Sequence, residues 1–145
     1  IISSGVSDVT IQNGIIRNVT GRGVLINPSC ARIKLSNVIF ENCATRGISG
    51  SIINNLEIEN CRFFSCCSAA TADSALFFDT CSQIQCTNCT ISSMTNNTAT
   101  LSGLSLTTVS LSSFGNLLIQ NNVSPIFNGV SAKTGTVNSP FPALL

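Results

Sequence analysis

One phrase of eleven residues recurs along this chain and limits the folds that it can adopt. The segment I-K-L-S-N-V-I-F-E-N-C begins at Ile33, and a related segment, L-E-I-E-N-C-R-F-F-S-C, begins at Leu56. Further copies begin at Val9, Ile84 and Ser112, so that successive copies are separated by 24, 23, 28 and 28 residues. An internal repeat of this length is typical of proteins that stack one structural unit on the next.

Within each copy, apolar and polar residues alternate on either side of an asparagine. A period of two residues is the pattern of a β-strand with one buried face. The asparagine interrupts the alternation, and this residue type tolerates a left-handed backbone and can hydrogen-bond along and across the chain. We therefore expect two strands joined at a bend in each copy, with a stacked ladder formed by Asn13, Asn37, Asn60, Asn88 and Asn116.

A third short apolar segment follows most copies. These segments begin at Gly23, Gly47, Ala75 and Gly103. Three short strands in about 25 residues describe one rung of a parallel β-helix, in which like residues stack about 4.8 Å apart. The sequence therefore predicts an all-β fold, a right-handed parallel β-helix solenoid of about five to six short rungs with an asparagine ladder.

The pattern from Val6 to about Phe127 resembles the pectin-lyase-like superfamily of parallel β-helices. In that superfamily a stacked asparagine ladder marks the turn between the second and third strands of a rung. The resemblance implies that Val9–Ile11 and Ile33–Leu35 lie on second strands, that Phe40 and its equivalents lie on third strands, and that the glycine-led segments are first strands. It implies the fold without singling out one member.

The chain of 145 residues is long enough for one domain with a sizeable core. We expect residues 1–5 to form the N-terminal end or a cap, residues 6–127 to form the rungs, and residues 128–145 to form a C-terminal cap or an oligomer contact. Pro140 and Pro142 favour this last boundary, because proline cannot continue a strand ladder. Exposure of Ile1 and Ile2 would require a covering partner chain or a flanking domain.

The composition limits the partners of the chain. Charged residues make up 9% and the net charge is +1, which gives no electrostatic basis for binding nucleic acid or an anionic membrane. No apolar run approaches the length of about 20 residues that membrane insertion requires. Because the chain begins without Met or a signal peptide, we interpret it as a fragment or processed product. We expect an extracellular, particle or cell-surface location, with an intracellular one left open, and protein chains at the β-helix ends or glycans as partners.

The eight cysteines follow the repeat. Cys43 and Cys66 share a phase in adjacent rungs, as do Cys61 and Cys89. We expect a stack of buried thiols, and the alternative is disulfides between rungs, because a spacing of about 4.8 Å can be bridged. The C-x-x-C that begins at Cys86 has no second pair at ligand spacing, and the chain has no histidine, so we predict no metal site and no cofactor.

The residues that the superfamily hydrolases use are missing from the matching positions. Those enzymes carry clustered aspartates at the start of the first strand, and two suitably spaced carboxylates are the minimum for glycoside hydrolysis. The matching positions here read Gly21-Arg22-Gly23, Thr45-Arg46-Gly47 and Asp73-Ser74-Ala75. A hydrolase-like R-I-K begins at Arg32, but its phase places it on a second strand. We therefore predict no catalytic residue.

The phase of the repeat explains most charges as lateral ion pairs between neighbouring rungs. Lys34 shares a phase with Glu57, and Asp8 shares one with Arg32. Exposed pairs of this kind contribute about 0–1 kcal/mol each. Glu57 and Glu59 resemble an acid–base couple, but we interpret them as structural.

Four residues remain as candidates for ligand binding. Arg22 and Arg46 are expected to stack on neighbouring rungs beside the loop that carries Asp73, where they can hold an anionic group or form one more salt bridge. Phe77 and Phe78 are neighbours that cannot both point inward, and we select Phe78 as the aromatic for ligand contact.

Sequons for N-glycosylation begin at Asn18, Asn88, Asn96 and Asn122. We expect Asn88 to be buried in the ladder and therefore unavailable. Asn96 lies in an expected loop, which makes it the best acceptor if the protein is secreted in a glycosylating host.

These observations predict a non-enzymatic structural or interaction module, such as a surface, adhesin or virus-particle component. The alternative is a fragment of a pectin-lyase-like polysaccharide lyase or hydrolase whose catalytic rungs lie outside these residues. An enzyme would require grouped carboxylates on adjacent first strands. An assembly role would require an exposed apolar patch or unprotected ends.

Overall fold

The computed structural model describes residues 1–69, 74–94, 102–120, 128–132 and 135–138. All regular secondary structure in these ranges is β-strand. The strands in chain order are β1 (Ser7–Val19), β2 (Val24–Ile26), β3 (Cys30–Cys43), β4 (Ile48–Ser51), β5 (Ile53–Glu59), β6 (Arg62–Phe64), β7 (Ser74–Asp79), β8 (Ser82–Thr87), β9 (Thr90–Ser92), β10 (Ser102–Thr107), β11 (Val109–Gly115), β12 (Leu118–Gln120), β13 (Asn128–Ala132) and β14 (Gly135–Asn138).

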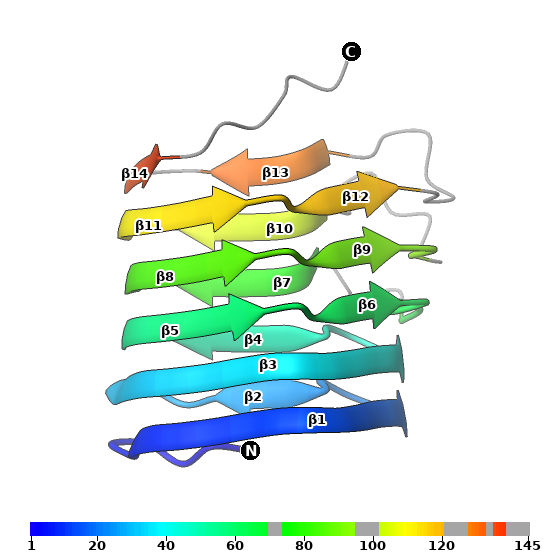
Figure 1. The fold of residues 1–145 in the computed structure, drawn as a ribbon, viewed down its shortest axis with the longest axis horizontal. Helices are drawn as coiled ribbons and strands as arrows, with labels where there is room; N and C mark the ends of the chain where they lie inside the picture. Colours follow the sequence, from blue (N-terminus) through cyan, green and yellow to red (C-terminus); the bar gives the residue numbers. More distant parts are fainter. Residues whose placement is uncertain (70–73, 95–101, 121–127, 133–134, 139–145) are drawn as a thin grey trace.

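The strands stack in parallel ladders that run along the axis of the coil, perpendicular to the strands (Figure 1). First strands pair in the order β2, β4, β7, β10 and β13 and form a five-stranded sheet. Second strands pair in the order β1, β3, β5, β8, β11 and β14. The second halves of β1 and β3 continue as third strands, which pair in the order β1, β3, β6, β9 and β12. Four turns are complete, from β2 to β12, and partial turns lie at both ends.

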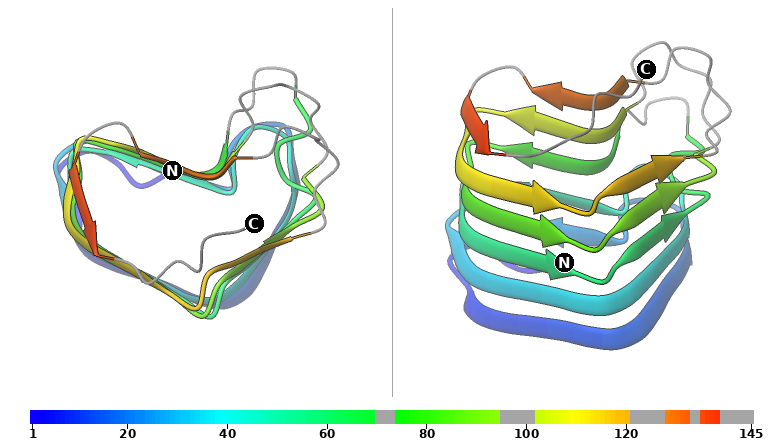
Figure 2. Two further views of the ribbon diagram at one scale, coloured as in Figure 1. Left: turned by 90° about the horizontal axis from the view of Figure 1, so that it is seen from above. Right: turned by 45° about the horizontal axis from the view of Figure 1, so that its top comes forward.

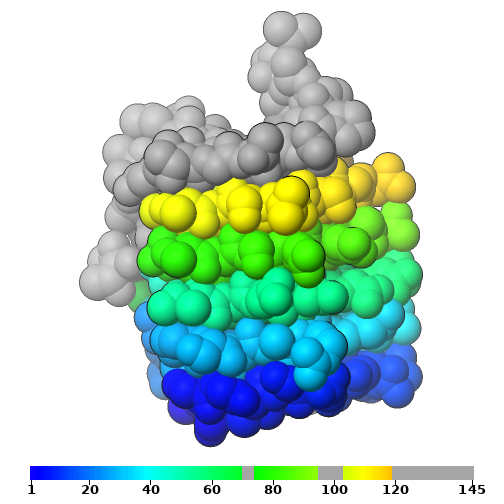
Figure 3. Space-filling model, turned by 90° about the vertical axis from the view of Figure 1, so that its left-hand side faces the viewer, coloured from blue at the N-terminus to red at the C-terminus, as the bar shows by residue number. Residues whose placement is uncertain are grey.

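The register of these ladders follows the repeat. Ile33 pairs with Val9 and with Leu56, and Leu56 pairs in turn with Ile84. Seen from above, successive turns superimpose around a common interior (Figure 2), and from the side they form stacked bands (Figure 3). The predicted all-β parallel β-helix with three strands per turn is confirmed.

The inward side chains of all turns form one continuous apolar core. Leu35, Leu56 and Ile58 are each 0% exposed. Phe40 and Phe63 stack with their ring centroids 4.8 Å apart and their planes 8° apart. Equivalent positions thus pack on themselves from turn to turn, as expected when a repeat buries its apolar face against its neighbours.

Four columns of residues with a left-handed backbone form the corners of the turns. Because this conformation costs about 1–2 kcal/mol for most residue types, its recurrence shows that the stacking determines the corner geometry. Cys67 is the one residue with positive φ in the described part of the chain that lies outside the columns. The columns consist of Gly5, Ser29, Ile52, Thr80 and Thr108, then Asp8, Arg32, Asn55, Gln83 and Leu111, then the five ladder asparagines, and finally Asn18, Asn42, Ser65 and Ser93.

The asparagine ladder is confirmed, but it lies on the outer surface. Asn37 Nδ2 donates to Asn13 Oδ1 at 3.2 Å, and Asn116 Nδ2 donates to Asn88 Oδ1 at 3.0 Å. All five asparagines are exposed, so the expectation that Asn88 is buried is wrong. The left-handed bend points the side chain outward while the residue that follows it, such as Val38, returns to the core.

The stacked strands extend beyond the expected boundary at residue 127. β13 pairs with β10, with Val130 opposite Leu104, and β14 pairs with β11. Residues 128–132 and 135–138, which we expected to belong to a C-terminal cap or an oligomer contact, contain the first and second strands of a further partial turn. Gly129 precedes Val130 as Gly103 precedes Leu104, and this glycine-led start marks the additional first strand. Pro140 and Pro142 lie outside the described residues.

Residues 1–5 lead into the first turn through a short paired segment. Ile2 forms a parallel bridge with Ile26, and its backbone N–H donates to the Leu25 carbonyl at 2.8 Å. Ile2 is 7% exposed, whereas Ile1 is 90% exposed. The expectation of two exposed isoleucines is thus correct only for Ile1.

The corner at Ile52 gives a stability prediction. Ile52 is β-branched, 52% exposed and has φ 51°, a conformation that asparagine adopts at lower cost. We expect Ile52→Asn to raise the free energy of unfolding by about 1 kcal/mol, measured by denaturant titration. The matched control is Ile15→Asn, because Ile15 is 58% exposed and has no left-handed backbone. If Ile52→Asn and Ile15→Asn both lowered the free energy of unfolding equally, the prediction that the backbone is strained at Ile52 would be wrong.

Candidate ligand-binding site

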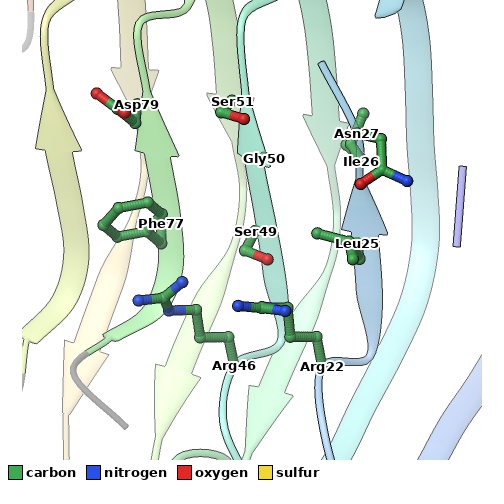
Figure 4. Close-up of a pocket in the computed structure, with 10 residues that line it drawn as sticks. All are labelled: Arg22, Leu25, Ile26, Asn27, Arg46, Ser49, Gly50, Ser51, Phe77 and Asp79. Atoms are coloured by element: carbon green, nitrogen blue, oxygen red, sulfur yellow. The ribbon is translucent and has the colours of Figure 1, made fainter. Parts of the chain in front are cut away.

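A cavity of about 250 Å³ lies on the outer face of the first-strand sheet. Its walls come from β2, β4 and β7 and from the turns that precede β2 and β4 (Figure 4). Leu25 pairs with Ser49, and Ser49 pairs with Phe77. Two residues further along these strands, Ser51 pairs with Asp79. Because alternate residues of a strand face the same side, these positions form two outward columns beside the core column of Ile26, Gly50 and Phe78.

Arg22 and Arg46 stand side by side at one end of the cavity (Figure 4). They lie on neighbouring turns, where the Gly23 N–H donates to the Arg46 carbonyl at 2.9 Å. The Arg46 guanidinium carbon is 4.0 Å from the centroid of the Phe77 ring. Stacking of this kind is a favourable cation–π contact. The structure thus brings together the two arginines that the sequence selected.

The glycines that follow the arginines allow the close approach of the third strand. A Cβ atom on Gly23 would lie 2.7 Å from Phe40 Cδ1, and one on Gly47 would overlap the Phe63 ring. The backbone that follows each arginine therefore lies directly against the stacked phenylalanines of the core. A recurring pair of a bulky third-strand residue and a first-strand glycine fixes this edge of the site.

Phe77, and not Phe78, is the aromatic of the site. Phe78 is 0% exposed and lies in the core column, whereas Phe77 lines the cavity. The selection of Phe78 is wrong because the register of β7 on β4 places Phe78 opposite the inward Gly50. Leu76 and Phe78 together continue the inward alternation, which leaves Phe77 on the outer face.

The carboxylate that lines the cavity is Asp79. Asp73 lies outside the described residues, so its predicted place beside the arginines stays a prediction. Asp79 Oδ1 accepts a hydrogen bond from Thr80 Oγ1 at 3.2 Å. Sequence reasoning missed Asp79 and Ser49, although their phase relative to Leu25 and Ser51 identifies both as outward residues of first strands.

The other charged residues form the lateral pairs that the repeat predicts. Arg32 donates twice to the Asp8 carboxylate, at 2.6 and 2.8 Å, and Lys34 Nζ lies 2.8 Å from Glu57 Oε1 and 3.6 Å from Glu59 Oε2. The pairs of Asp8 with Arg32 and of Lys34 with Glu57 are confirmed. The hydrogen bond from Arg32 lowers the pKa of Asp8, and the hydrogen bond to Glu57 raises the pKa of Lys34.

All eight cysteines are buried and are free thiols in this structure. Cys61 Sγ donates to the Leu35 carbonyl at 3.7 Å, and Cys89 Sγ donates to the Ile58 carbonyl at 3.8 Å, so each thiol contacts the preceding turn. The predicted stack of buried thiols is confirmed. The described residues contain no group of three side chains that could hold a metal ion.

The buried thiols predict a loss of stability in alkali. The hydrogen bond to Cys89 raises the pKa of Cys61, and burial raises that of Cys81. The hydrogen bond with Cys61 lowers the pKa of Cys89, but contact with Cys86 and burial outweigh it and raise the value to about 12. Above the ordinary thiol pKa of 9.0 the unfolded chain binds fewer protons than the folded one, so the free energy of unfolding falls as pH rises toward 12.

The expected slope is up to about 1.4 kcal/mol per pH unit for each such thiol. Denaturant titrations at pH 8, 9 and 10 in the presence of a reductant would measure it. The variant Cys89→Ala should show a shallower slope. A free energy of unfolding that stays constant over this range would contradict the prediction.

Comparison with known proteins identifies the fold family. The family model described as "Right handed beta helix region" matches residues 1–140. Comparison with curated proteins and with solved structures gives no match. Within the described ranges, no segment is a helix of the length and hydropathy needed to cross a membrane. The family match agrees with the resemblance to pectin-lyase-like β-helices.

Proposed function

Because the chain belongs to the right-handed β-helix family, we propose that it is a non-enzymatic structural and interaction module, such as a cell-surface, adhesin or virus-particle component. The observation that supports this most directly is that Glu57 and Glu59 are both ion-paired with Lys34. Both carboxylates lie within 4 Å of Lys34 Nζ, at 2.8 and 3.6 Å. They therefore serve as partners of a cation on the surface of β5 rather than as an acid and a base.

The ends of the coil are the proposed contact sites for other protein chains or flanking domains. Among the described strands, β1 pairs only with β3, so one edge of its backbone has no strand beside it. Val9 and Ile11 of β1 are partly exposed, whereas their partners Ile33 and Leu35 are at most 1% exposed. An unpaired strand edge with apolar side chains favours addition of a further strand. Such contacts suit an extracellular or particle-surface location, where glycans are further candidate partners.

A turnover assay tests the absence of enzymatic activity. The protein is incubated with polygalacturonate and with a neutral polysaccharide, and new reducing ends and unsaturated products are measured. We expect no product above the buffer control, for the wild type and for the double variant Glu57→Gln/Glu59→Gln. Turnover that disappears in the double variant would replace the proposal with the alternative of a polysaccharide lyase or hydrolase.

The interaction role is tested by light scattering coupled to size-exclusion chromatography, with and without reductant. If the ends mediate assembly, we expect a defined oligomer that is converted to a smaller species by Ile11→Lys on the exposed edge of β1. The control Ile15→Lys changes an outward residue of the same strand. An oligomer unaffected by Ile11→Lys, or a monomer at all concentrations, would contradict assembly through this end.

A further inference from the structure

A buried hydroxyl without a partner lies in the wall of the first-strand cavity. Ser49 is 2% exposed, and its Oγ atom has no hydrogen-bond partner in the structure. Ser49 belongs to the outward column between Leu25 and Phe77, so the side chain faces the cavity and not the core (Figure 4). A buried hydroxyl that makes no hydrogen bond costs free energy. This position therefore favours an occupant that accepts a hydrogen bond.

The charges beside Ser49 determine what this occupant is. Arg22 and Arg46 line the same cavity, and a guanidinium group has hydrogen-bond donors but no acceptor. The stack of Arg46 on Phe77, at 4.0 Å, orients its planar group. Two guanidinium groups and a serine hydroxyl thus line the same cavity (Figure 4). This set suits an oxyanion, because arginine matches the geometry of carboxylate, sulfate and phosphate oxygens.

The opposite end of the cavity has the reverse polarity. Asp79 lines it two residues beyond Phe77 on β7, which is about 7 Å along a strand. A carboxylate there would repel a second anionic group and would accept a hydrogen bond from a hydroxyl or an ammonium group. Asn27 adds an amide at this end. The volume of about 250 Å³ is below the usual range for drug-sized ligands, so the occupant is small.

We propose that this cavity binds a small ligand, or the end of a longer one, whose oxyanion lies between Arg22, Arg46 and Ser49. A hydroxyl or ammonium donor of the same ligand is directed toward Asp79. The site is independent of the proposed function, because a ligand can bind there whether or not the coil assembles with other chains.

Chemical-shift titration of the 15N-labelled protein tests the site. The probes are sodium phosphate, sodium sulfate, gluconate and hexanoate, each at constant ionic strength with chloride as the reference. We expect saturable shifts of the Ser49 and Phe77 amides with at least one oxyanion. Gluconate should bind more tightly than hexanoate, because only gluconate carries hydroxyl donors for Asp79. Stronger binding of phosphate or sulfate than of gluconate would identify a phosphorylated or sulfated ligand as the source of the oxyanion.

Variants separate the contributions of the two ends. Arg22→Gln/Arg46→Gln should weaken binding of the best oxyanion at least tenfold, and the control Arg62→Gln, on a different ladder, should leave it unchanged. Asp79→Asn should weaken gluconate binding and strengthen phosphate binding. Ser49→Ala should weaken binding several-fold while the free protein stays as stable as the wild type, because the lost hydroxyl had no partner.

Three results would overturn the proposal. One is an absence of saturable shifts with every probe. The second is binding that Arg22→Gln/Arg46→Gln and Arg62→Gln reduce equally, which would show a general ionic effect only. Loss of binding in Ser49→Ala together with unfolding of that variant would also count against it, because the hydroxyl would then be structural.

Discussion

Replacing Phe63 with alanine is expected to lower the free energy of unfolding by about 3–5 kcal/mol. Phe63 is 1% exposed and stacks on Phe40 with the ring centroids 4.8 Å apart. Its removal takes away the apolar contact with the core and leaves a cavity that the neighbouring turns, held by their backbone ladders, cannot close. Equilibrium denaturation monitored by circular dichroism would measure the loss.

The matched control is Phe64→Ala, which removes the same side chain from the next position of β6. Phe64 is 40% exposed and lies on the outer face, so the expected cost is about 1 kcal/mol or less. Because Phe63 lies in a central turn, its loss should also weaken the coupling between the two halves of the coil and broaden the transition. Similar losses for the two variants would contradict the described packing.

The second large effect is expected from a single added methyl group. In Gly47→Ala, the Cβ atom would overlap the Phe63 ring and would lie 3.2 Å from the Ala75 carbonyl oxygen. The ring is packed and the carbonyl accepts the Gly47 N–H at 2.9 Å, so neither can move without disturbing the ladder. Overpacking of this kind costs about 1–3 kcal/mol.

Gly14→Ala and Gly21→Ala are the controls for Gly47→Ala. A Cβ atom at either position has no atom within 4 Å, so changes within about 0.5 kcal/mol are expected. Combining Gly47→Ala with Phe63→Leu should recover part of the loss, because the smaller side chain leaves room for the methyl group. Equal effects of the three glycine changes would show that backbone entropy, and not the Phe63 contact, sets the cost.

The fold could be predicted from the sequence because each turn repeats the same alternation of apolar and polar residues around an asparagine. Alternation around Asn37 and Asn60 fixes which side chains are buried, and in-register stacking then fixes their neighbours. The pair of Lys34 with Glu57 follows from the offset of 23 residues alone. In this fold, the local alternation and the repeat offset together predict the tertiary contacts between turns.

The site was harder to predict because no local sequence pattern marks the residues that line it. Ser49 resembles any surface serine, and it becomes buried only because Leu25, Phe77 and the arginines of two turns surround it. Phe78 was misplaced for a related reason. The choice between Phe77 and Phe78 depends on the register of β7 against Gly50, and the insertion before β7 hides that register in the sequence.

The spacing between copies has an evolutionary consequence. The offset rises from 23 to 28 residues, yet Leu56 still pairs with Ile84 as Ile33 pairs with Leu56. The additional residues enter between the third strand of one turn and the first strand of the next, after Phe64 and again after Ser92. Length at this corner can therefore change without moving a single core residue out of its column. Selection can therefore change the length of this connection while the buried repeat, on which stability depends, stays the same.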